Sequence, residues 1–159
     1  MFIFVGMKVI TAHYMGRILG CILLVFMLGC DKDRGNRNPY LIEAGFRFDL
    51  NLNLPLYSPL RFTGNAVYVD ANGVGTRGVF VMNVGNDQFR AYEASCPNHL
   101  PNECSTMQLK SDIAICPCED FEYYLFTGQQ ASPPQDGTRY YDLLEYRTDF
   151  NGGVVSVSN

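Results

Sequence analysis

The chain has 159 residues, a formal net charge of −4, 47% hydrophobic residues and 13% aromatic residues. This length allows about one domain of the usual ~100–150 residues, and this hydrophobic content excludes a collagen-like or fully disordered chain. The 12 lysine and arginine residues are scattered along an acidic chain, which excludes the basic patch expected of a nucleic-acid-binding protein.

The first 29 residues differ in composition from the rest of the chain. They contain no Asp or Glu, and Lys8 and Arg17 are their only Lys and Arg residues. Residues 18–28 form an apolar run that is too short for the ~20 residues of a membrane-spanning helix and fits the hydrophobic region of a signal peptide. We therefore predict a signal peptide over residues 1–29, with Met15 as an alternative start.

The end of this apolar run resembles the lipobox of bacterial lipoproteins. It reads Met27-Leu28-Gly29-Cys30, although Met27 departs from the usual Leu. The resemblance implies acylation of Cys30, which would hold the chain at a membrane surface without spanning it. Residues 30–40 then form the acylated cysteine and a polar tether, and we expect a domain outside the cytoplasm, anchored to the inner or outer membrane of a bacterial cell envelope.

The rest of the chain, residues 41–159, has the pattern of short strands. Residues 46–54 alternate apolar and polar side chains for nine positions, which predicts a half-buried strand that ends at Pro55. Further strands are predicted between turn residues and lie at 66–70, 78–84, 88–94, 113–116, 122–126, 143–148 and 154–158. No amphipathic helix of ten or more residues is predicted after residue 29. The expected fold class is all-β, a sandwich or small barrel.

Beyond Cys30, this domain has four cysteines, Cys96, Cys104, Cys116 and Cys118, and its only histidine is His99. In an exported protein, four cysteines within 23 positions are first a disulfide candidate and then a metal site. The sequence lacks the Gly-x-Ser-x-Gly, P-loop and His-Glu-x-x-His patterns, so it gives no basis for assigning an enzyme activity.

The two Cys-bearing segments resemble the two loops of the Rieske iron–sulfur domain. The family's loops read C-x-H and C-x-x-H about 16 residues apart; here CPNH begins at Cys96 and CPCE begins at Cys116, and 16 residues separate His99 from Cys116. The resemblance continues through the segments YYLFTGQ, LLEYRT and VVSVSN, and covers residues 66–159. It implies a Rieske-like antiparallel β-sandwich or small barrel with a two-loop, Cys-rich subdomain.

The chain departs from the ligand set that this resemblance implies. A Rieske centre uses two Cys and two His ligands. Cys96 and Cys116 match the thiolate ligands, but Glu119 stands where the second histidine belongs, and His99 lies one position late in its loop. We therefore expect a cluster-free domain with no cofactor that has a structural or binding role in the envelope. Its expected partners are the membrane, which it contacts through the lipid anchor, and an envelope protein.

The same resemblance implies how the cysteines pair. Cys96 and Cys116 would face each other at the loop tips and form one disulfide, and Cys104 and Cys118 resemble a second bridged pair. One alternative keeps a single disulfide and leaves two free thiols. Three further alternatives remain. The first is an electron-transfer protein that carries a [2Fe–2S] cluster on Cys96, His99, Cys116 and Glu119; the second is zinc on Cys96, His99, Cys116 and Cys118; the third is a redox-active bridge within Cys116-Pro117-Cys118.

Overall fold

The computed structural model describes residues 38–159, and Asn38–Asn159 form one unit by their internal contacts. The predicted signal peptide, the acylation site Cys30 and the tether up to residue 37 lie outside the described residues. Asn38, at the end of the predicted tether, already contacts the domain, because its side chain donates a hydrogen bond to the carbonyl of Pro97. No helix in the part of the chain that the structure describes is long and apolar enough to cross a membrane.

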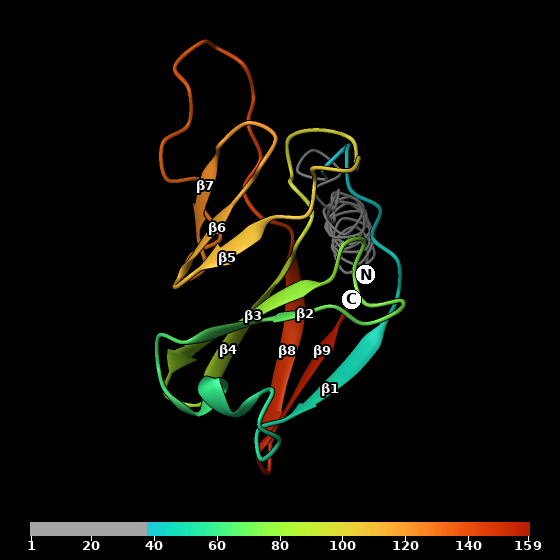
Figure 1. Cartoon of the computed structure of the whole chain (residues 1–159), viewed down its shortest axis with the longest axis vertical. Helices are drawn as coiled ribbons and strands as arrows, with labels where there is room; N and C mark the ends of the chain where they lie inside the picture. Colours follow the sequence, from blue (N-terminus) through green and yellow to red (C-terminus); the bar gives the residue numbers. More distant parts are fainter. Residues whose placement is uncertain (1–37) are drawn as a thin grey trace, which may run out of the picture. The chain divides into compact units, whose positions relative to one another are not determined.

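The larger of the two sheets in the described chain is antiparallel and has six strands (Figure 1). Its strand order is β1-β9-β8-β4-β3-β2. The strands are β1 (Arg47–Asn51), β9 (Val154–Ser158), β8 (Glu145–Asn151), β4 (Gln88–Glu93), β3 (Val79–Gly85) and β2 (Ala66–Val69). A 3-10 helix, η2 (Ser58–Arg61), lies in the connection between β1 and β2.

A smaller antiparallel sheet of three strands carries the two Cys-bearing loops. Its order is β5-β6-β7, with β5 (Gln108–Lys110), β6 (Ile113–Ile115) and β7 (Glu122–Tyr124). The first Cys loop runs from the end of β4 to the start of β5, and the second joins β6 to β7. The fold is all-β, with a large sheet and a small Cys-rich subdomain, as the sequence predicts.

Strand β3 shows how the two sheets share their hydrophobic core. Side chains alternate between the two faces of a strand, so Val79 and Val81 enter one buried cluster while Phe80 and Met82 enter another. The first cluster contains residues from all six strands of the large sheet and from η2, so this sheet curves around it. The second also holds buried residues of the small subdomain, including Cys96 and Cys116. The Cys loops are therefore fixed by core packing at their bases.

The first predicted strand is longer than the observed one. The alternation over residues 46–54 predicts nine residues, but β1 ends at Asn51. There the carbonyl of Asn51 accepts a hydrogen bond from the amide of Leu54, and its side-chain oxygen accepts one from the amide of Asn53. Asn commonly closes turns in this way, so the chain turns four residues before Pro55 in spite of the alternating pattern.

Candidate functional site

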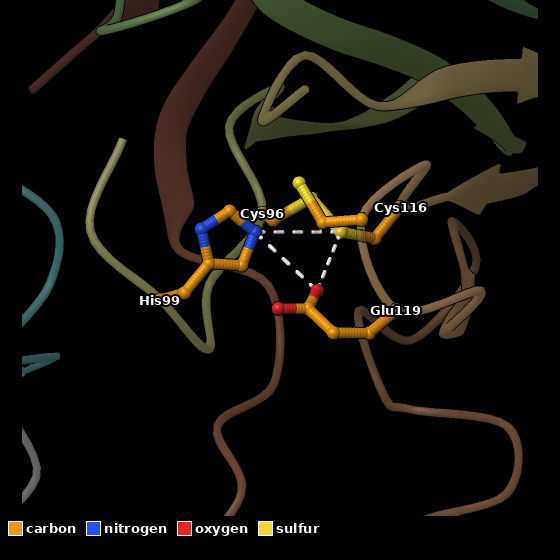
Figure 2. Close-up of side chains that lie close together, drawn as sticks. Cys96, His99, Cys116 and Glu119 are labelled. Atoms are coloured by element: carbon orange, nitrogen blue, oxygen red, sulfur yellow. Dashed lines mark hydrogen bonds and ion pairs between the residues drawn. A yellow bond between two sulfur atoms is a disulfide. The ribbon is translucent and has the colours of Figure 1, made fainter. Parts of the chain in front are cut away.

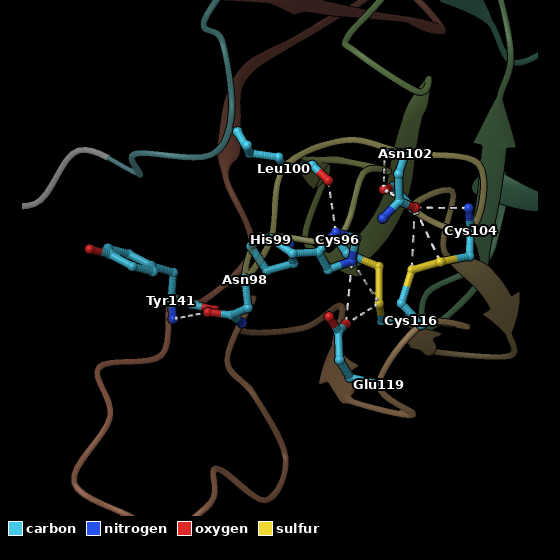
Figure 3. A network of polar contacts seen from close by, with 12 residues as sticks. Cys96, Asn98, His99, Leu100, Asn102, Cys104, Cys116, Glu119 and Tyr141 are labelled. Carbon is cyan, nitrogen blue, oxygen red and sulfur yellow. Dashed lines mark hydrogen bonds and ion pairs between the residues drawn. A yellow bond between two sulfur atoms is a disulfide. The ribbon is translucent and has the colours of Figure 1, made fainter.

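The first Cys loop is held in place by its own backbone and by one asparagine. The amide of Cys96 donates to the carbonyl of Ser105, which closes the base of the loop. The side-chain oxygen of Asn102 accepts hydrogen bonds from the amide of Cys104 and from the hydroxyl of Ser105. Ser105 is fully buried. Hydrogen bonds therefore close the first Cys loop at its base and fix its backbone around Asn102 (Figure 3).

The second Cys loop is a tight turn between β6 and β7. The amide of Cys116 donates to the carbonyl of Phe121, and the amide of Asp120 donates to the carbonyl of Cys116. Asp120 has a φ of 59°, in the left-handed region that Asp tolerates better than most residues. This turn brings Glu119 back toward the sulfur of Cys116.

Both loops are joined by disulfides. Cys96 is bonded to Cys116, with their Cα atoms 5.6 Å apart, and Cys104 is bonded to Cys118, with a Cα separation of 5.5 Å. These are the two pairs named in the sequence analysis. Cys116 and Cys118 are bonded to different partners, so the alternative of a bridge within Cys116-Pro117-Cys118 is not the arrangement found.

The side chains of His99 and Glu119 meet at Sγ of Cys116, in the Cys96–Cys116 disulfide (Figure 2). Nε2 of His99 lies 3.6 Å from Sγ of Cys116 and 3.3 Å from Oε2 of Glu119, and this oxygen lies 2.9 Å from the same sulfur. A disulfide sulfur carries no hydrogen, so the last distance is a close sulfur–oxygen contact. The structure thus brings together the four residues that the sequence analysis named as an alternative metal site.

His99 is oriented by its other ring nitrogen. Its Nδ1 lies 2.9 Å from the carbonyl oxygen of Leu100. A carbonyl can only accept, so Nδ1 carries the hydrogen, and Nε2 is the atom left to face Cys116 and Glu119. The side chain of His99 is 17% exposed and that of Glu119 is 33% exposed, whereas Cys96 and Cys116 are fully buried. The site is therefore open to solvent on its His–Glu side.

Asn98 occupies the position at which the C-x-H pattern has its histidine, and it performs a structural task there. Its side-chain nitrogen donates to the hydroxyl of Tyr123 at 2.8 Å and to the carbonyl of Tyr141 at 3.0 Å, and its oxygen accepts from the amide of Tyr141 at 2.7 Å. Burial raises the pKa of the Tyr123 hydroxyl. Asn98 thereby joins the first Cys loop to the segment before β8. The sequence analysis did not single out this residue, although its place in the motif was a signal.

Glu93 is a second residue that the sequence analysis did not identify. It is the last residue of β4 and is fully buried. Its carboxylate accepts a hydrogen bond from the amide of Ser95, two positions later in the first Cys loop. A carboxylate among Ala91, Tyr92 and Ala94 is unusual enough to suggest a buried polar network. No carboxylate other than Glu93 is buried in residues 38–159.

The structure brings all the site residues named in the sequence analysis, apart from Cys30, into one region of the small subdomain. Cys96, Cys116, His99 and Glu119 meet at one point, and Cys118 has its sulfur within 4.8 Å of the ligand atoms of these four. Cys104 lies beside them through its bond to Cys118. Two Cys-bearing loops that meet in this way on a small β-subdomain, next to a larger antiparallel sheet, are the features that the resemblance implies.

With its large antiparallel sheet and its small sheet that carries two disulfide-linked Cys loops, the described part of the chain has a Rieske-like arrangement. Among solved structures, the chain is similar to one from the complex of reduced oxygenase and oxidized ferredoxin in carbazole 1,9a-dioxygenase, with a TM-score of 0.45 and 22% identity over 74% of this chain and 94% of that one. It is also similar to the plasma membrane Rieske protein PetC3 from Synechocystis PCC 6803, with a TM-score of 0.44 and 20% identity over 58% and 85% of the two chains.

A third similar structure is the quaternary ammonium Rieske monooxygenase CntA, with a TM-score of 0.45 and 15% identity over 63% of this chain and 29% of that chain. No model of a known protein family matches the chain, and no curated protein does. With identities below 25% and TM-scores below 0.5, these likenesses carry no conclusion about what this chain does.

The residues at this site do not fit a conventional Rieske cluster. Such a cluster needs two thiolates and two imidazoles. Here the sulfurs of Cys96 and Cys116 are bonded to each other, Glu119 replaces one imidazole, and the side chain of Asn98 is engaged with Tyr123 and with the Tyr141 backbone. Of the four ligands that such a cluster needs, only the imidazole of His99 remains.

Proposed function

We propose that this chain is a lipid-anchored, Rieske-like domain of the bacterial cell envelope that carries no iron–sulfur cluster, is stabilised by two disulfides, and has a structural or partner-binding role. The observation that carries the proposal is the Cys96–Cys116 disulfide, because it uses both sulfurs that a cluster of this family would need. Both cysteines are fully buried, so the bond is part of the core as well as of the loops.

The position of Asn38 supports a membrane-proximal role for the Cys loops. Asn38 contacts Pro97 of the first loop and lies eight residues after the proposed acylation site Cys30. Eight extended residues span at most about 29 Å. An acyl chain on Cys30 would therefore keep the first loop, with its exposed Leu100, within reach of the bilayer surface. We infer that an envelope partner would meet this loop near the membrane.

The experiment that tests the cluster-free state uses the full-length chain from a bacterial host that loads iron–sulfur clusters. The chain is purified from membranes without oxygen, and its iron content, visible absorption and free thiols are measured on one sample. We expect no iron, no visible absorption, and no free thiol at Cys96, Cys104, Cys116 or Cys118. Two irons per chain would overturn the proposal.

The anchor is tested separately by labelling cells with a radioactive fatty acid. We expect the parent chain to carry label and to sediment with membranes, and the Cys30→Ala variant to lose the label. Cys21→Ala is the matched control because Cys21 lies within the predicted signal peptide and outside the lipobox. A labelled Cys30→Ala chain would contradict acylation at this position.

A second candidate is an electron-transfer protein with a [2Fe–2S] cluster on a noncanonical ligand set. The observation that favours it is the convergence of Cys96, His99, Cys116, Cys118 and Glu119, whose ligand atoms all lie within 4.8 Å of one another. It requires the Cys96–Cys116 disulfide to be absent in the loaded protein. Iron and a Rieske-type spectrum in the experiment above would select this candidate.

A further inference from the structure

We infer that reduction of the Cys96–Cys116 disulfide opens a mononuclear zinc site whose four ligands are Sγ of Cys96, Sγ of Cys116, Nε2 of His99 and Oε2 of Glu119. The inference goes beyond the proposed function, which concerns the oxidised chain. Zn²⁺ takes thiolate, imidazole and carboxylate ligands in tetrahedral geometry, and this group offers four such donors.

Two of the distances between the donors match a tetrahedron around zinc, and the two sulfurs would have to move apart after reduction, from 2.05 Å to roughly 3.8 Å. With Zn–S near 2.3 Å and Zn–N near 2.0 Å, a sulfur and a nitrogen on one zinc lie roughly 3.5 Å apart, and a nitrogen and an oxygen roughly 3.4 Å apart. The observed separations are 3.6 Å from Cys116 to His99 and 3.3 Å from His99 to Glu119. Oε2 of Glu119, 2.9 Å from Cys116, needs an outward shift of about 0.6 Å, which a side chain that is 33% exposed can make.

The orientation of His99 is the one found in metal-bound histidines. Such a histidine almost always donates its second ring nitrogen to a carbonyl, carboxylate or water, which fixes the tautomer and presents the other nitrogen to the metal. Nδ1 of His99 has this partner in the carbonyl of Leu100. Nε2 therefore already points at the place where the metal would lie.

Charge explains why the reduced site would take a cation. The contacts among Cys116 Sγ, Glu119 Oε2 and His99 Nε2 place three acceptor atoms together. Two thiolates and a carboxylate would bring up to three negative charges to one point after reduction. Like charges this close disfavour ionisation, and a divalent cation relieves the repulsion.

The structure assigns Glu119, and not Cys118, as the fourth ligand. The sequence alternative placed zinc on Cys118, but this cysteine is bonded to Cys104 in a separate disulfide. Glu119 contacts both Cys116 and His99. The zinc site can therefore form while the Cys104–Cys118 disulfide stays intact.

The reaction that opens the site is a thiol–disulfide exchange with a dithiol reductant. One thiolate of the reductant attacks a sulfur of the Cys96–Cys116 bond and forms a mixed disulfide with it. The second thiolate of the reductant then attacks the mixed disulfide. The products are the two thiols of Cys96 and Cys116 and the oxidised, cyclic or bridged form of the reductant. Zinc binding then releases both thiol protons to water.

The test uses Co²⁺ as the probe on the full-length chain, before and after reduction by a phosphine that is removed without oxygen. Tetrahedral Co²⁺ with thiolate ligands gives intense visible and near-ultraviolet bands. We expect about one Co²⁺ per reduced chain, displaced by Zn²⁺, and none on the oxidised chain. Equal binding by both forms, or no binding by the reduced chain, would overturn the inference.

Variants assign the ligands. We expect Glu119→Gln to weaken binding by at least about tenfold and Cys116→Ser by at least about 100-fold, because loss of a second-shell partner alone costs 10–100-fold. Glu122→Gln, at an exposed carboxylate in the neighbouring strand β7, is the matched control and should bind as the parent does. The C104S/C118S double variant should keep the site. Equal affinity of Glu119→Gln and Glu122→Gln, or loss of binding in a folded C104S/C118S chain, would refute the ligand set.

Discussion

Glu93 is a fully buried carboxylate with a complete set of donors. Its two oxygens accept hydrogen bonds from the backbone amides of Thr76 at 2.6 Å, Arg77 at 2.9 Å and Ser95 at 2.9 Å, and from the hydroxyl of Tyr146 at 2.7 Å. Hydrogen bonds to a charged acceptor in a low-dielectric interior are stronger than neutral ones. Glu93 thereby connects the turn before β3, the start of the first Cys loop and strand β8.

We expect Glu93→Gln to lower the free energy of unfolding by about 2–4 kcal/mol. The amide keeps the shape but loses the charge, and its nitrogen is a donor placed against other donors. Urea denaturation followed by circular dichroism measures the change. Glu122→Gln, exposed on β7, should stay within about 0.5 kcal/mol of the parent. A Glu93→Gln chain as stable as this control would show that the carboxylate charge contributes little.

The turn that follows β7 depends on a glycine packed against β4. Gly128 has a φ of +77°, and a Cβ placed on it would lie 2.7 Å from Cε1 of the buried Tyr92. The amide of Gly128 donates to the carbonyl of Tyr124, and its carbonyl accepts from the amide of Leu143. The turn therefore combines a left-handed backbone with a close approach of the chain to the core.

We expect Gly128→Ala to destabilise the domain by about 2–5 kcal/mol, because left-handed strain of about 1–2 kcal/mol adds to overpacking of about 1–3 kcal/mol. Gly137→Ala is the matched control: Gly137 has a φ of +79°, but nothing lies within 4 Å of an added Cβ. It should show the strain alone. Thermal unfolding of the two variants separates the terms, and equal losses would mean that Tyr92 moves aside without cost.

The two disulfides stabilise the same pair of loops but differ in burial. Their sequence separations of 20 and 14 predict similar gains, about 3 kcal/mol each, from the lower entropy of the unfolded chain. Cys96 and Cys116 also belong to the hydrophobic cluster between the sheets, whereas Cys104 is exposed. The lower entropy of the unfolded chain thus favours both bonds. Both cysteines of Cys96–Cys116 are fully buried in the core, whereas in the other bond only Cys118 packs against it, partly buried.

We expect the C104S/C118S variant to lose about 3 kcal/mol of unfolding free energy and the C96S/C116S variant to lose more, because two hydroxyls then replace buried sulfurs. Double variants leave no unpaired thiol from the broken bridge. Guanidinium denaturation of the two chains makes the comparison. If C104S/C118S proves the less stable of the two, burial of the Cys96–Cys116 bond is not the deciding factor.

Across residues 38–159, period-two patterns predicted most of the strands because every strand except β5 has at least one buried side chain. Strand β9 matches its predicted residues 154–158, and the alternation of β3 divides its side chains between two cores. The helix η2 was not predicted, because four residues are too few for a helical period. At the site, the cysteines and His99 were visible as a motif.

Glu93 and Asn98 were not found from the sequence for a different physical reason. Their partners are remote in the chain: Tyr146 lies 53 residues after Glu93, and Tyr141 lies 43 residues after Asn98. No local pattern encodes such a pair, since only the register of β4 against β8 and the path of the loop before β8 bring the groups together. The only local signals were the position of Glu93 among apolar neighbours and the position of Asn98 where the motif has a histidine.

Tyrosines whose pKa is raised by burial affect how the stability of the domain responds to alkaline pH; Tyr92 is one of them, and Tyr123 and Tyr146 have the largest shifts. Burial raises the pKa of Tyr123, and burial together with the hydrogen bond to Glu93 raises the pKa of Tyr146. In the unfolded chain a tyrosine loses its proton near pH 10. The unfolded state therefore binds fewer protons than the folded state above about pH 10, so the stability that these neutral hydroxyls contribute is fully present below this pH and is lost as the pH rises.

The expected slope is a loss of about 1.4 kcal/mol per pH unit for each of these tyrosines above about pH 10. Urea denaturation in steps from about pH 8 to about pH 11 measures it. Tyr146→Phe should reduce the slope by about 1.4 kcal/mol per pH unit, because its hydroxyl no longer ionises in the unfolded state alone. Tyr124→Phe, at an exposed side chain, is the control and should keep the parent slope. An unchanged slope in Tyr146→Phe would mean that Tyr146 ionises at the same pH in the folded chain, which a hydroxyl bonded to the buried carboxylate of Glu93 should not do.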